Sequence, residues 1–145
     1  MENNIQIIYV LMILVFLGVA AYFDIRYKRI PLWVQGMGVI FGCIGIIIQG
    51  PQWTNLFALI PGIFLLVLSF VTGESIGYGD GISVLILGGL AGFNNCMWVL
   101  CISLIFVSMA GIILIAIKRA TRKTKLPYIP FLLAAEGVWL VGKIL

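Results

Sequence analysis

Two aspartates lie at the edges of apolar segments, where a carboxylate is costly unless it has a partner or a task. Asp24 follows an apolar run that begins at Ile5, and Asp80 lies in the glycine-rich run GYGDG, residues 77–81. Two carboxyls held within hydrogen-bond reach cannot both ionise easily, so one stays protonated while the other remains a base. Such a pair can activate water and polarise a peptide carbonyl. The chemistry that the pair predicts is hydrolysis.

Each acidic residue taken alone also has a structural interpretation. Asp24 would then be an interfacial charge paired with Arg26 or Lys28, and Asp80 would be a helix N-cap. Glu136 is either a third polar group near the two aspartates or a carboxyl that faces the bundle and is hydrogen-bonded to another helix. We favour the second interpretation for Glu136, because a carboxyl within the membrane needs a partner in any case.

The glycines around Asp80 favour the functional interpretation of that residue. Gly77 and Gly79 allow backbone conformations that are closed to other residues, and they let a substrate backbone approach closely. Irregular backbone at membrane depth is tolerated where it is buried in protein or lines a wet cavity. A pocket that opens to the cytoplasm would satisfy this condition.

The elements that must position these residues are membrane helices. Of the 145 residues, 63% are hydrophobic and 10% are charged, and the mean hydropathy is +1.20. Soluble domains carry about 45–50% apolar and about 25% charged residues, so this composition indicates lipid as the solvent. The basic residues flank apolar segments, which is typical of topology signals and not of a nucleic-acid surface. No basic region precedes the first apolar run, so no cleaved signal peptide is expected.

A membrane-spanning helix needs about 20 apolar residues, which predicts an all-α bundle of about six transmembrane helices in a single domain, residues 1–145. The third helix is expected from Asn55 to Thr72. The long apolar run over residues 82–117 is expected to break at Asn94-Asn95, because two adjacent amides favour a turn. The remaining helices are expected over residues 5–23, 31–48 and 130–145.

Small residues inside the apolar segments predict close packing of helices. Gly38 and Gly42 have the small-xxx-small spacing that lets membrane helices approach, and so do Gly88 and Gly92. The chain has three cysteines and no histidine. Neither a metal site nor a disulfide is expected from this pattern, so the cysteines are interpreted as packing residues.

The positions of lysine and arginine predict the orientation of the bundle. They gather in residues 24–30 and 118–129, and only Lys143 falls on the other side. Basic loops stay in the cytoplasm, so these two connections and residues 73–81 are expected there, with both termini outside. Asp24 and Asp80 then share the cytoplasmic face.

Two segments of the chain resemble the type IV prepilin peptidase family, the A24-type membrane aspartyl proteases. The segment FDIRYKRIP, residues 23–31, matches the family pattern F-D-x5-I-P, and IGYGDG, residues 76–81, matches G-x-G-D. LPYIPFLLAA, residues 126–135, is similar to the P-x-x-P-F-L stretch of the last helix. The resemblance implies that Asp24 and Asp80 are the catalytic aspartates.

The resemblance also implies a substrate and a location. It implies an endopeptidase in the inner membrane that removes the leader of prepilin-like substrates at the cytoplasmic face, after a glycine, without a cofactor. Ile82 and Leu32 stand where many members have lysine and asparagine. The N-terminal extension that long members use in methylation is missing from this sequence, so the chain resembles the short form of tight-adherence pilus systems. No methyltransferase activity is expected.

Alternatives from other functional classes stay open. A membrane transporter or proton pathway would use carboxylates strung along a route through the bilayer. A structural component of a pilus or secretion assembly would need no proton sharing. Presenilin-like proteases share G-x-G-D, but their Y-D and P-A-L motifs are missing here. The sequence does not assign the base and the acid between Asp24 and Asp80.

Overall fold

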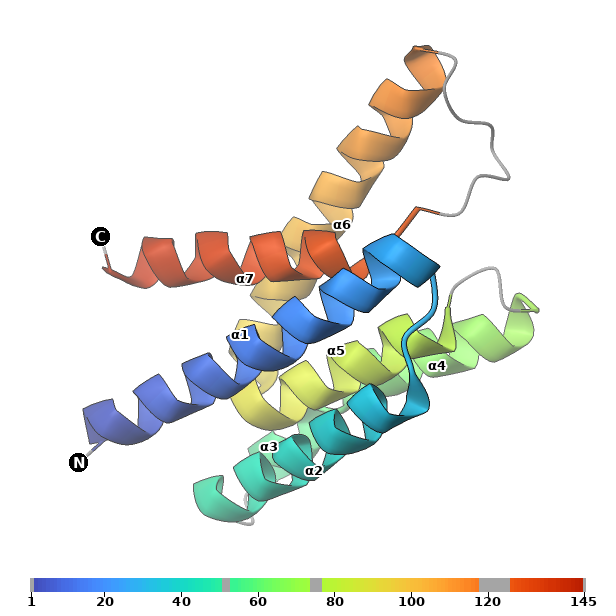
Figure 1. Ribbon diagram of the computed structural model, residues 1–145. Coiled ribbons are helices and arrows are strands. Elements are labelled where there is room, and N and C mark those ends of the chain that lie inside the picture. Colours follow the sequence, from blue (N-terminus) through green and yellow to red (C-terminus); the bar gives the residue numbers. More distant parts are fainter. Residues whose placement is uncertain (1, 51–52, 74–76, 118–125, 145) are drawn as a thin grey trace.

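The computed structural model describes residues 2–50, 53–73, 77–117 and 126–144, and all regular structure in these ranges is helical (Figure 1). The all-α prediction is therefore confirmed. The helices are α1 (Glu2–Tyr27), α2 (Leu32–Gln49), α3 (Trp53–Phe57), α4 (Ile60–Val71), α5 (Tyr78–Ala91), α6 (Phe93–Ala116) and α7 (Ile129–Ile144).

Three of these helices are long and apolar enough to cross a membrane. They are Gln6–Tyr27 within α1, the whole of α2, and α6. Helices α4 and α5 are apolar but shorter. Many large apolar side chains on the outer faces are exposed, as lipid contact requires, and α6 carries several of them from Leu104 onward. The arrangement of six spans stays a prediction.

Helix α5 lies in the middle of the bundle, where it packs against α4, α2, α1 and α6 (Figure 1). Its buried side chains include Val84, Ile86 and Leu87, which is expected of a helix surrounded by others. The neighbouring helices lie so close to α5 that their backbones nearly touch. A Cβ on Gly62 of α4 would lie 2.5 Å from Leu85 Cα. On the other side, a Cβ on Gly89 would lie 3.1 Å from the carbonyl oxygen of Gly42 in α2.

The expected third helix is in fact two helices, α3 and α4, with a turn at Ala58 and Leu59. Pro61 explains the break, because proline lacks an N–H and its ring collides with the carbonyl four residues earlier in a continuous helix. Proline is well tolerated in the first turn of a helix, and α4 begins with it there. The prediction of one continuous helix from Asn55 to Thr72 was wrong.

The turn between α5 and α6 lies at Gly92, and the prediction of a break at Asn94-Asn95 was wrong. Gly92 has φ +79° and ψ 168°, a conformation open to glycine. Both asparagines belong to the first turn of α6. The Asn95 side-chain amide donates a hydrogen bond to the carbonyl of Ala91 at 2.9 Å, so it satisfies a backbone group at the end of α5 instead of forming the turn.

Gly92→Ala should destabilise the fold by roughly 1–3 kcal/mol, because an L-residue is strained at this backbone conformation. Gly111→Ala is the matched control in α6, where a Cβ would meet, among the described residues, only Leu126 Cδ1 at 3.7 Å. The measurement is unfolding in mixed detergent and SDS. Equal unfolding midpoints for the two variants would contradict the conformational argument.

Both termini lie at one end of the bundle, and the α1–α2 connection and the beginning of α5 lie at the other (Figure 1). Asp24 in the last turn of α1 and Asp80 in the first turn of α5 are therefore at the same end. The basic residues 118–125 lie outside the described residues. The orientation of this end toward the cytoplasm stays a prediction.

Candidate active site

Asp24 is buried against the beginning of α7, with 7% of its surface exposed. The backbone N–H of Ile129 donates to Asp24 Oδ2 at 3.0 Å, and the backbone N–H of Tyr128 also hydrogen-bonds the carboxyl. Free N–H groups at a helix N-terminus favour an anion, so this place suits a carboxylate. The structural interpretation paired Asp24 with Arg26 or Lys28, but the hydrogen-bond partners of its carboxyl in the described residues are backbone N–H groups, and Arg26 Nη1 donates to Tyr22 Oη at 3.2 Å.

Asp80 is part of helix α5, although the sequence indicated a loop up to residue 81. The N-cap of α5 is Gly77, so the alternative structural interpretation of Asp80 as the N-cap does not hold. The backbone N–H of Gly77 nevertheless hydrogen-bonds the Asp80 carboxyl. A side chain in the first turn that reaches back to the N-cap N–H has the geometry of one half of a capping box.

The fold brings the two aspartates together. Asp80 interacts electrostatically with Asp24, although the residues come from different helices. Asp80 is half-buried, whereas Asp24 is buried. Each carboxyl already accepts at least one backbone hydrogen bond, which fixes its position before any substrate is present. Both carboxyls are held in position, and one of them is partly exposed. This arrangement suits the activation of water.

Gly79 packs closely against the side chains of Gln35 in α2 and of Ile30 in the α1–α2 connection. A Cβ on Gly79 would lie 2.8 Å from Gln35 Nε2 and 3.0 Å from Ile30 Cδ1. Gln35 is buried, with 7% of its surface exposed, and the sequence analysis did not identify it. The signal was an amide in the first turn of a largely apolar helix. Gly77 leaves room for the Asp80 carboxyl, because a Cβ on Gly77 would lie 3.2 Å from Asp80 Oδ2.

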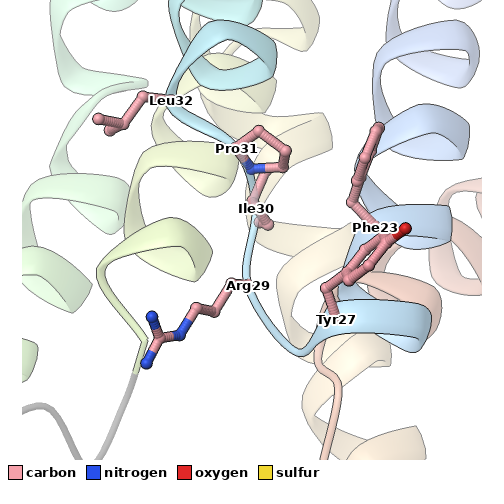
Figure 2. Close-up of a pocket in the computed structure, with 6 residues that line it drawn as sticks. All are labelled: Phe23, Tyr27, Arg29, Ile30, Pro31 and Leu32. Carbon is pink, nitrogen blue, oxygen red and sulfur yellow. The ribbon is translucent and has the colours of Figure 1, made fainter.

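An open cavity of about 450 Å³ lies at the α1–α2 connection, next to Asp24 in the chain (Figure 2). Figure 2 shows the Arg29 guanidinium turned toward the backbone that leads into α5, while aromatic rings from α1 form the opposite wall. Lys28 has φ +51°, which turns the chain sharply after α1. The cavity is lined by Phe23, Tyr27, Arg29, Ile30, Pro31 and Leu32.

Glu136 lies in the interior of α7, with 3% of its surface exposed, as the sequence predicted. The predicted hydrogen bond to another helix is not seen at Glu136 Oε2, which has no partner in the part of the chain that the structure describes. Cys96 of α6 lies within electrostatic range of this carboxyl. Ile82, at the position of the family lysine, is half-buried and packs against the apolar core.

A hydroxyl pair beside the aspartates was missed by the sequence analysis. Tyr128 Oη and Ser103 Oγ are 2.7 Å apart and join the beginning of α7 to α6. Ser103 is fully buried, and Tyr128 interacts electrostatically with Asp80. Tyr128 lies in the recognisable segment LPYIP, but nothing in the sequence identified Ser103 as its partner.

Comparison with known protein families gives a match over the region that carries this site. The family model described as the type IV leader peptidase family matches residues 11–117, more than half of the 145 residues. The chain belongs to this family. The match includes both aspartates and confirms the family that the motifs indicated. No curated protein and no solved structure matches the chain. Membership in the type IV leader peptidase family and the long apolar helices make this a membrane peptidase.

Proposed function

We propose that this type IV leader peptidase is an intramembrane aspartyl endopeptidase in which Asp24 and Asp80 activate water together. The observation that supports the proposal is the placement of both aspartates at one end of the bundle, by α1 and α5, within electrostatic range of each other. Both residues fall within the region that matches the family. A second carboxylate nearby opposes ionisation, so two carboxyls brought together during the reaction would share a proton.

The proposed reaction needs one ionised and one protonated aspartate. The ionised aspartate takes a proton from water as the water oxygen bonds to the peptide carbonyl carbon, and the protonated one gives its proton to the carbonyl oxygen. The resulting gem-diol then returns a proton to the second aspartate as the C–N bond breaks. The leaving nitrogen takes the proton held by the first aspartate. Both carboxyls end in their starting states, so no cofactor is consumed.

The proposed substrate is a prepilin-like protein whose leader precedes a hydrophobic helix. The patterns F-D-x5-I-P and G-x-G-D support this class, because they surround Asp24 and Asp80 as in the prepilin peptidases that the chain resembles. The exposed cations Arg26, Lys28 and Arg29 lie beside the site and support a cytoplasmic face. We accordingly place the enzyme in the inner membrane as a multi-pass protein.

The test is cleavage of a prepilin in membranes that contain the protein. Co-expression should shorten the prepilin by the length of its leader, visible on a gel. A matched prepilin in which the glycine before the cleavage site is replaced by valine should stay at full length. Intact prepilin in membranes that hold the folded peptidase would overturn the proposal. Transport of protons by vesicles that contain the protein, without cleavage, would favour the proton-pathway alternative.

A further inference from the structure

Gln35, in the first turn of α2, is a buried amide whose side-chain hydrogen-bonding groups are not used within the described part of the chain. Only 7% of its surface is exposed. Its backbone N–H donates to the carbonyl of Pro31 at 3.3 Å, but its side chain makes no hydrogen bond to any residue that the structure describes. A carboxamide has two N–H donors and an accepting oxygen, and burial without partners is unfavourable for both. An apolar side chain at this position would stabilise the fold more.

The Gln35 amide lies beside the turn of α5 that carries Asp80. A Cβ on Gly79 would lie 2.8 Å from Gln35 Nε2, so the amide lies against the glycine that precedes Asp80. Ile30 packs on the same glycine and also lines the open cavity at the α1–α2 connection (Figure 2). The cavity and the amide are thus adjacent through Ile30 and Gly79. A molecule that enters the cavity beside Ile30 would come close to Gln35.

The main chain of an extended peptide is the ligand whose chemistry matches such an amide. The segment around a scissile bond cannot stay helical, because water and the carboxyls must reach its carbonyl carbon. Its N–H and C=O groups then need partners, since unpaired peptide groups are unfavourable away from water. A side-chain amide offers both a donor and an acceptor to one peptide group. It carries no charge, so it does not select an ion.

We propose that Gln35 is a substrate-binding residue that hydrogen-bonds a backbone peptide group of the substrate next to the bond that is cleaved. The assignment rests on the proposed function and extends it, because it names the group that recognises the main chain of the substrate. Recognition of main chain does not depend on the side chain at that position of the substrate. Proton transfer stays with Asp24 and Asp80.

The experiment compares Gln35→Met with the wild type, both as full-length proteins in detergent. Methionine keeps the length of glutamine but lacks the hydrogen-bonding groups of the amide. In prepilin cleavage, KM should rise about tenfold while kcat stays within about a factor of two, because a contact made equally in the ground state and the transition state is lost. The unfolding midpoint in SDS should equal or exceed that of the wild type, because an unpaired buried amide has been removed.

Gln49→Met is the matched control, the same substitution near the other end of α2. Gln49 Nε2 donates to the carbonyls of Gly89 at 3.3 Å and Leu90 at 3.1 Å, so the fold uses this amide. The variant should unfold at a lower concentration of SDS than the wild type, while its folded fraction keeps the wild-type KM. The two glutamines of one helix are therefore expected to give opposite results.

A second measurement identifies the peptide group that Gln35 binds. Synthetic prepilin peptides carry a single ester in place of one backbone amide near the scissile bond. An ester lacks the N–H and has a weaker accepting carbonyl. One of these peptides should have a raised KM with the wild type and no further rise with Gln35→Met, because two changes to one hydrogen bond are not additive.

A wild-type KM in Gln35→Met would overturn the assignment. An unfolding midpoint lowered as far as in Gln49→Met would overturn it too, because the amide would then be held within the fold or by a buried water. Additive effects of the ester and of Gln35→Met in every peptide would also contradict it. A wild-type protein that cleaves no prepilin would instead refute the proposed function.

Discussion

Asp24→Asn and Asp80→Asn should each abolish prepilin cleavage, with at least about a thousandfold loss of rate, while the protein still inserts in the membrane. An amide keeps the size of the carboxyl but can neither take a proton from water nor return one. Asp24→Asn would still face the N–H of Ile129, which donates to Asp24 Oδ2 at 3.0 Å in the native protein. The asparagine carbonyl can accept that bond, so folding should be little affected. The measurement is leader loss in membranes with protein amounts matched by blotting.

The double variant is the sharper test of the dyad. Residues that act as one catalytic unit are strongly non-additive, so Asp24→Asn with Asp80→Asn should be scarcely slower than either single variant. Glu136→Gln is the matched control, a carboxyl-to-amide change at a buried residue of α7, and it should retain most activity. Substantial cleavage by either single aspartate variant would remove the dyad as the mechanism. Loss of cleavage only in parallel with loss of protein would favour a structural role.

Gly62→Ala should give a large loss of stability, because its new methyl group would collide with the backbone of α5. The Cβ would lie 2.5 Å from Leu85 Cα and 2.6 Å from Leu85 N. Backbone atoms cannot rotate away as a side chain can, so α4 and α5 must separate. Overpacking of this kind costs about 1–3 kcal/mol or more. The expected result is a much lower unfolding midpoint in SDS, with cleavage reduced in proportion to the folded fraction.

Gly137→Ala is the control for Gly62→Ala. It makes the same substitution in α7, where a Cβ would meet none of the described residues within 4 Å. Alanine is the better helix former, so this variant should match or slightly exceed the wild type in stability. A Gly62→Ala protein as stable as the Gly137→Ala protein would show that the α4–α5 contact is looser than the structure has it.

The long helices, and the placement of both aspartates at one end of the bundle, were predictable from the sequence for identifiable reasons. The long apolar runs of α1, α2 and α6 need no tertiary context, because a run of that length is stable as a helix in lipid. Asp24 and Asp80 could be identified as candidate site residues because each lies within a recognisable motif. The turn at Gly92 was missed because amides are as typical of turns as glycine, and packing decided between them.

The remaining parts of the site were not predictable, because each depends on a contact between residues that lie far apart in the sequence. Ser103 is one hydroxyl in an apolar helix, and its meaning depends on Tyr128, 25 residues away along the chain. Gln35 matters because Gly79 of another helix packs on its amide. The split between α3 and α4 depends on Pro61, which is tolerated in membrane helices often enough that its presence alone did not predict a break.

The glycine contacts that hold α5 between α2 and α4 also determine which half of the site can move. The backbone of α5 is packed closely against α2 on one side and α4 on the other. We therefore expect Asp80 to move only when the whole helix moves. Asp24 is less constrained by backbone packing. Its helix is followed by the sharp turn at Lys28, and its carboxyl is hydrogen-bonded to the start of α7. We therefore expect any change in the distance between the two carboxyls to come from a joint movement of α1 and α7 relative to α5.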